Sequence, residues 1–195
     1  INNSSFVVPS NSPGIRLRTT ILNRYHIQFG FSSQDNAGVR LFNDLYKIAS
    51  LGFTFAPASS FESNIRMYGY QVPAANDKYG FGLSLDKVFF NKFNVFGRYG
   101  LNQDALEEFW GVKSSWSSGL RFVESINNHP LAIGIAYAEN FSSINNLKKE
   151  KITELYIRRQ LNRWVHISPH IQYIWNRKGT SEDLSVIGIR THFNF

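Results

Sequence analysis

The chain has 195 residues, of which 43% are hydrophobic and 15% aromatic, with a formal net charge of +7 and a mean hydropathy of −0.26. The longest apolar run, 131–138, is far shorter than the roughly 18 residues of a membrane-spanning helix, which excludes a helical membrane protein. The absence of cysteine is compatible with export to an oxidising compartment but does not demonstrate it.

Alternation of apolar and polar residues predicts about eleven strands. In chain order they lie at 15–21, 24–33, 47–56, 63–71, 78–88, 92–100, 114–124, 131–139, 151–161, 164–175 and 183–195. In most of them one parity is apolar, as at Phe29 and Phe31, and the other is small or polar, as at Gln28 and Gly30. The range 63–71 alternates poorly, so its register is the least defined. We expect the apolar parity to face lipid and the polar parity to face inward.

The connections between these strands alternate between short turns and longer polar loops. Short turns are predicted at 22–23, 57–60, 90–91, 125–129 and 162–163, and longer loops at 34–46, 72–77, 101–113, 140–150 and 176–182. Outer-membrane barrels place tight turns in the periplasm and long loops outside the cell. On this assignment the last strand ends in the periplasm at Phe195, a closing aromatic residue of the kind that the barrel-assembly machinery reads.

These patterns predict an all-β fold, a transmembrane antiparallel outer-membrane β-barrel. A soluble barrel or β-sandwich with inverted faces is the alternative, but strands of about ten residues match membrane strands better than the usual five or six. Closed barrels normally have an even strand number, whereas this count is odd. We therefore expect residues 1–195 to be the C-terminal portion of a longer single barrel domain, with 1–14 as an extracellular loop or linker. The alternative is a twelfth strand at 5–8.

The polar parity of the predicted strands carries many charged residues. The predicted pore-lining residues are Arg16, Arg18, His26, Gln28, Arg98, Arg121, Glu154, Arg158, His166, His170, Gln172 and Arg190. A wet lumen tolerates such charges, while an Arg or Lys at the lipid midplane costs about 2–4 kcal/mol. A positive lumen favours anions and acidic solutes. In the alternative interpretation, many of these residues pair with carboxylates such as Glu154 or Asp86 and only fill the wall.

Other kinds of site are poorly supported. His166 and His170 lie on one strand but roughly 13 Å apart at strand rise, too far for a shared metal ion, so we expect no metal and no cofactor. Ser168 between them has no recognisable orienting group, so we expect no catalytic residues and no enzyme. The basic charge is spread over alternating strands without a recognition helix, which argues against nucleic acid as a partner.

Aromatic residues near the strand ends are expected at the membrane interface. They are Trp116, Trp164, Phe193 and Phe195. Outer-membrane lipid is the expected partner of this band. The basic run 148–151 lies at the outer rim, where it either contacts lipopolysaccharide phosphates or is a solvated loop. A homo-oligomer is left open, because no interface is legible.

Several blocks of the sequence resemble the C-terminal half of the OprB-like carbohydrate-selective porins. These blocks are 80–86, 94–100, 154–161, 164–174 and 187–195, and their order and spacing match from about residue 78 to the end and more loosely from residue 13. The resemblance implies a passive channel of roughly sixteen strands in the bacterial outer membrane, within the even-numbered range of such barrels. The run 176–179 replaces the Asn-Pro-Gly-Gly-type turn usual in the family, and the chain is basic, so substrate preference does not transfer automatically.

The leading functional hypothesis is therefore a passive diffusion channel for small hydrophilic solutes, sugars or anions, with a basic lumen. The loops 101–113 or 140–150 are candidates to fold inward and narrow it. The alternative is a barrel that serves as an outer-membrane anchor or scaffold in a surface protein complex.

Overall fold

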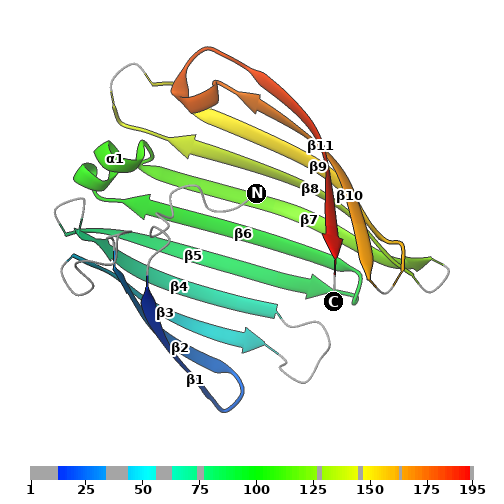
Figure 1. Ribbon diagram of the computed structural model, residues 1–195, viewed down its shortest axis with the longest axis horizontal. Helices are drawn as coiled ribbons and strands as arrows, with labels where there is room; N and C mark the ends of the chain where they lie inside the picture. Colours follow the sequence, from blue (N-terminus) through cyan, green and yellow to red (C-terminus); the bar gives the residue numbers. More distant parts are fainter. Residues whose placement is uncertain are drawn as a thin grey trace.

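The computed structural model describes residues 13–33, 44–55, 63–73, 77–126, 129–144, 147–162 and 164–193. They form one antiparallel sheet of 11 strands with a short helix, α1, and the 3-10 turn η2 (Figure 1). The elements are β1 (Gly14–Ile21), β2 (Tyr25–Ser33), β3 (Leu45–Phe55), β4 (Ser63–Val72), β5 (Lys78–Phe89), β6 (Phe93–Asn102), α1 (Asp104–Trp110), β7 (Ser114–Ile126), β8 (His129–Phe141), β9 (Glu150–Gln160), β10 (Val165–Trp175), η2 (Arg177–Gly179) and β11 (Leu184–Phe193). Within these ranges, neither helical element has the length and apolar character needed to cross a bilayer.

The strands lie side by side in chain order, from β1 at one edge to β11 at the other. Each of the eleven predicted ranges overlaps one observed strand, and the poorly alternating range 63–71 corresponds to β4. The all-β prediction is therefore confirmed. Within the described residues, no pairing joins β1 to β11, so each of these two strands has one neighbour.

One face of the sheet is apolar and exposed. It includes Phe81, Leu83 and Leu85 on β5, and Ile187 and Ile189 on β11, the last two 82% and 68% exposed. The charged residues that the registers place on this face all lie near strand ends; they are Lys47, Lys87, Glu124, Glu139, Lys151 and Arg159. The middle of the described apolar face is thus free of charge, as a lipid-facing surface requires.

Two hairpin turns show how the backbone geometry of a turn sets the register of the strands that it joins. Leu22 and Asn23 both have a φ of 52°, and Phe90 and Asn91 have φ values of 51° and 56°. Such paired positive φ angles belong to turns whose twist matches that of the flanking strands. The turns close with hydrogen bonds of 3.1 Å, from the Arg24 amide to the Ile21 carbonyl and from the Lys92 amide to the Phe89 carbonyl.

The opposite, inner face is built from aromatic rings laid over glycines of the neighbouring strand. The Phe96 ring lies over Gly119, where a Cβ would come within 2.4 Å of Phe96 Cε1 and 2.7 Å of the Ile135 carbonyl oxygen. Tyr156 covers Gly134 in the same way. Small and large residues therefore alternate across the strands and fill the inner surface without steric conflict.

The two ends of the strands differ. Helix α1 and η2 lie at one end of the sheet, and the β1–β2 and β5–β6 hairpins lie at the other (Figure 1). This separation follows the predicted division into long loops and short turns. The alternation in length is not strict, however: five residues, 73–77, join β4 to β5, whereas seven, 56–62, join β3 to β4 on the side of the short turns.

Candidate functional site

Side chains from β6 to β11 line one cavity of about 620 Å³ on the inner face. Four arginines, Arg98, Arg121, Arg158 and Arg190, line it together with a single carboxylate, Glu154. Because six consecutive strands contribute to one space, the sheet is concave on this face. The lining is strongly basic, since four guanidinium groups face one carboxylate.

Arg98 is held in place by an ion pair, two hydrogen bonds to backbone carbonyls and an aromatic ring. One guanidinium nitrogen, Nη2, lies 2.9 Å from Asp86 Oδ1, and the other, Nη1, donates to the carbonyls of Leu85 at 2.8 Å and Gly97 at 3.0 Å. The guanidinium carbon also lies 5.1 Å from the centre of the Phe96 ring. Its charge is thus largely balanced, and its geometry is fixed.

Arg190 is paired with the buried carboxylate of the cavity. Its Nη2 lies 3.0 Å from Glu154 Oε1, and the Glu154 side chain is only 4% exposed. In register, Arg190 lies opposite Ser168 and Glu154 lies opposite Gln172, so the ion pair crosses β10 diagonally. A buried carboxylate needs such partners, because an unpaired buried charge is costly.

Arg121 and Arg158 differ from these two arginines. In the described ranges neither makes an ion pair or a side-chain hydrogen bond. Arg121 lies between Asn94 and Gly134 in the sheet, and Arg158 lies opposite Ala132. Both side chains are exposed, so they present guanidinium groups to the cavity without a carboxylate beside them.

The cavity brings together half of the predicted pore-lining residues. These are Arg98, Arg121, Glu154, Arg158, His166 and Arg190. The other six lie on the same inner face by register but do not line this cavity: Arg16, Arg18, His26 and Gln28 on β1 and β2, and His170 and Gln172 on β10. Their role in lining a pore stays a prediction.

The inner face also carries Arg66, which the sequence interpretation did not include. Arg66 lies in register with Gly52 and Ser84, and its side chain is exposed. The alternation in β4 is obscured because Tyr68 and Tyr70 place large rings on the polar parity. Pairing with the clearly patterned β5 is the signal that would have placed Arg66 correctly.

The predicted interface aromatics lie on exposed positions near strand ends. Trp116 is the third residue of β7, Trp164 directly precedes β10, and Phe193 ends β11, with exposed fractions of 42%, 47% and 58%. Phe195 lies outside the described residues, so the predicted contact with the assembly machinery is not addressed. The position of this band at a membrane interface stays a prediction.

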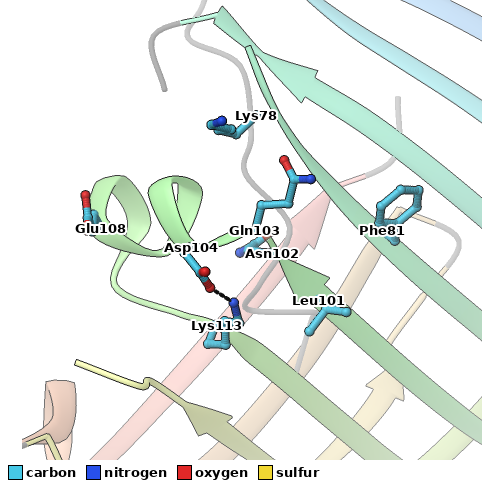
Figure 2. Close-up of a pocket in the computed structure, with 8 residues that line it drawn as sticks. All are labelled: Lys78, Phe81, Leu101, Asn102, Gln103, Asp104, Glu108 and Lys113. Carbon is cyan, nitrogen blue, oxygen red and sulfur yellow. Dashed lines mark hydrogen bonds and ion pairs between the residues drawn. The ribbon is translucent and has the colours of Figure 1, made fainter. Parts of the chain in front are cut away.

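A second hollow, of about 590 Å³, lies beside α1 (Figure 2). Asp104 of the helix points toward Lys113 and forms an ion pair with it, whereas Glu108, which also lines the hollow, lies across the helix from this pair. Charges of both signs surround this hollow without converging, so the arginine-lined cavity is the better candidate site. No group of three or more His, Cys, Asp or Glu side chains in the described part of the chain is arranged to hold a metal ion.

Comparisons with known proteins place this geometry in a family. The model of the carbohydrate-selective porins of the OprB family matches residues 46–195. An uncharacterized protein of Aquifex aeolicus (strain VF5) is 28% identical over 195 residues, which cover 100% of this chain and 54% of that protein.

A solved structure, the high pH structure of Pseudomonas putida OprB, is similar with a TM-score of 0.68 at 14% sequence identity. The match covers 94% of this chain and 59% of that chain, and at this identity it shows the fold alone. The chain thus spans about half the length of the curated relative that it matches. From the family match over residues 46–195, the chain belongs to the OprB family of carbohydrate-selective porins.

Proposed function

We propose that the full-length protein forms a passive diffusion channel for small hydrophilic solutes in the bacterial outer membrane. Membership of a porin family supports this, as does the division of the sheet into an apolar face and a concave, arginine-lined face. A membrane barrel has this arrangement, with an apolar band outside and a polar interior. The channel belongs to the whole barrel, of which this chain provides about half.

Further strands are part of this proposal. In a bilayer every backbone polar group must be paired, so spanning sheets are closed. Within the described residues, β1 and β11 each pair on one side only. We infer that additional strands pair with these two edges and that residues 1–195 form the C-terminal portion of a single barrel domain of roughly sixteen strands.

Carbohydrates are the proposed solutes because the family description names them and because the cavity offers suitable chemistry. The guanidinium groups of Arg121 and Arg158 can donate to sugar hydroxyls. The rings of Phe96 and Tyr156 line the same cavity and provide apolar faces.

The basic lining supports a further preference for anions over cations. The observation that carries this proposal is the pair Arg121 and Arg158, whose charges are not balanced by a carboxylate within the described residues. Arg98 contributes less, since Asp86 balances it.

Reversal potentials of the full-length protein in planar bilayers, under a KCl gradient, test the proposed channel and its proposed preference for anions. We expect open channels that prefer chloride, and a severalfold lower preference in the double variant Arg121→Gln, Arg158→Gln. The matched control, Arg98→Gln with Asp86→Asn, removes one arginine without changing the net charge and should leave the ratio near that of the wild type.

A cation-preferring wild type, or equal ratios in the two double variants, would contradict the anion proposal. Absence of channels from the folded full-length protein would contradict the channel itself and favour the scaffold.

A further inference from the structure

Helix α1 packs against the inner face of the sheet, at the end of the strands that carries the longer loops. Leu106 of this helix is completely buried and packs with Tyr46, Tyr70 and Val72. Tyr70 belongs to the inner face, because it lies in one cross-strand row with Gly80 and Asn102 and donates a 2.7 Å hydrogen bond to Asn102 Oδ1. The connection between β6 and β7 thus covers part of the inner wall.

The residue after Leu106, Glu107, is a buried carboxylate with four donors. Its side chain accepts hydrogen bonds from the hydroxyls of Ser142 at 2.6 Å and Ser143 at 2.7 Å, and from the backbone amide of Ile144 at 3.3 Å. The backbone amide of Ser143 is the fourth donor. All four belong to the segment that follows β8, so one side chain joins two loops that are distant in sequence.

The later part of the same connection, close to the start of β9, is hydrogen-bonded to the next long loop. The Lys148 amide donates to the Gly179 carbonyl at 2.8 Å, and Glu150 Oε1 accepts from the Lys178 amide at 2.8 Å. At this end of the sheet, the described residues of three connections are therefore joined in pairs: α1 to 142–144, and 148–150 to η2. Glu107 is the side chain through which α1 accepts hydrogen bonds from the 142–144 segment.

Helix α1 has only seven residues, too few to be stable alone, so its position depends on tertiary contacts. Those contacts include the apolar packing of Leu106, the Asp104–Lys113 ion pair and the hydrogen bonds of Glu107. Hydrogen bonds to a charged acceptor are the stronger kind. Without the carboxylate, the donors at 142–144 lose their acceptor, and the helix loses its hydrogen bonds to that segment.

We propose that Glu107 is a positioning residue, which holds α1 against the inner wall as a clamp. It thereby limits the free cross-section of the proposed channel at the end of the strands that carries the longer loops. This inference rests on the proposed channel function and names the side chain that sets its aperture. Releasing the clamp should let α1 leave the wall and expose Leu106.

The first test is single-channel recording of the full-length protein. Glu107→Ala should give a larger or more strongly fluctuating conductance than the wild type. The matched control is Glu108→Ala, which removes the same charge from the next residue, a side chain that is exposed and makes no side-chain hydrogen bond in the described ranges. Glu107→Gln keeps an oxygen acceptor, so its conductance should lie between those of Glu107→Ala and Glu108→Ala. Identical conductance in Glu107→Ala and Glu108→Ala overturns the proposal.

The second test needs no current and so separates the clamp from the channel function. Residues 1–195 contain no cysteine, so Leu106→Cys gives the single thiol of this part of the protein, on the buried side of the helix; the full-length protein without this substitution gives the background labelling. In the folded full-length protein, a water-soluble maleimide should label this thiol about tenfold faster or more in the Glu107→Ala background than in the Glu108→Ala background, since hydrogen bonds to a charged group are each worth about such a factor. Equal labelling rates would overturn the clamp even if the channel proposal holds, and wild-type silence in bilayers would overturn only the channel.

Discussion

Glu107 is a carboxylate whose ionisation is controlled by its neighbours. Burial raises its pKa, but the hydrogen bonds from Ser142, Ser143 and Ile144 outweigh burial and hold the pKa below the ordinary value of 4.5. None of the four donors is ionisable, so these bonds depend on the charge of Glu107 alone. A lowered pKa in the folded state means that the ionised carboxylate stabilises the fold above the ordinary pKa, and that this stabilisation is lost as pH falls through the folded value.

We therefore expect a pH-dependent difference between the full-length wild type and Glu107→Gln. Near neutral pH the wild type should be more stable by about 1.5–3 kcal/mol, the range for hydrogen bonds to a charged group. Below pH 4.5 the difference should shrink, because the wild-type carboxyl is then neutral as well. Unfolding in detergent at a series of pH values measures both proteins; a difference that stays constant down to acid pH would show that charge is not what holds the segment.

The arginines show how far the sequence determines a site. Their place on the inner parity followed from alternation, but their partners did not. Arg98 pairs with Asp86 as the wall-filling interpretation allowed, and Arg190 reaches diagonally to Glu154, whereas Arg121 and Arg158 stay without a carboxylate in the described residues. Such pairing depends on register across three strands, which periodicity within one strand does not contain.

Among the elements, the β6–β7–β8 part of the sheet depends on the close approach of Phe96 and the Ile135 carbonyl to Gly119. Gly119→Ala should destabilise the full-length protein by about 1–3 kcal/mol, because the added methyl group overpacks a fixed backbone oxygen as well as a ring. Gly97→Ala is the control, since a Cβ there meets no atom within 4 Å. Urea unfolding of both variants measures the difference, and equal midpoints would show that the inner wall adapts freely.

The strands were predictable and α1 was not, for a physical reason. Strand alternation is a property of the sequence itself, so all eleven ranges were found, with boundaries that differ by a few residues. The range 101–113 was predicted only as a loop with a tendency to fold inward. Its helix is too short for a periodic signal, and it is stabilised by Leu106 and Glu107 through contacts with β3, β4 and the 142–144 segment.

At the scale of the whole molecule, the two faces of the sheet are expected to differ in their tolerance of charge. Leu51→Arg, on the apolar face near the middle of β3, should lower the stability of the full-length barrel in lipid by about 2–4 kcal/mol. Ser50→Arg places the same side chain on the inner face, opposite Gln28 and Tyr68, and should cost much less. The folded fraction in vesicles, followed by heat-modifiable gel mobility, measures both, and equal losses would contradict the assignment of the faces.

The strictly sequential order of the strands has a consequence for how the molecule forms. Every described strand pairs only with the strands before and after it, so each new contact closes a short stretch of chain and costs little loop entropy. The sheet can therefore grow one hairpin at a time. In the proposed barrel, joining the two edges of this sheet to further strands would bring together residues far apart in the chain, and such nonlocal pairing is the slow kind of step that sets the rate of folding.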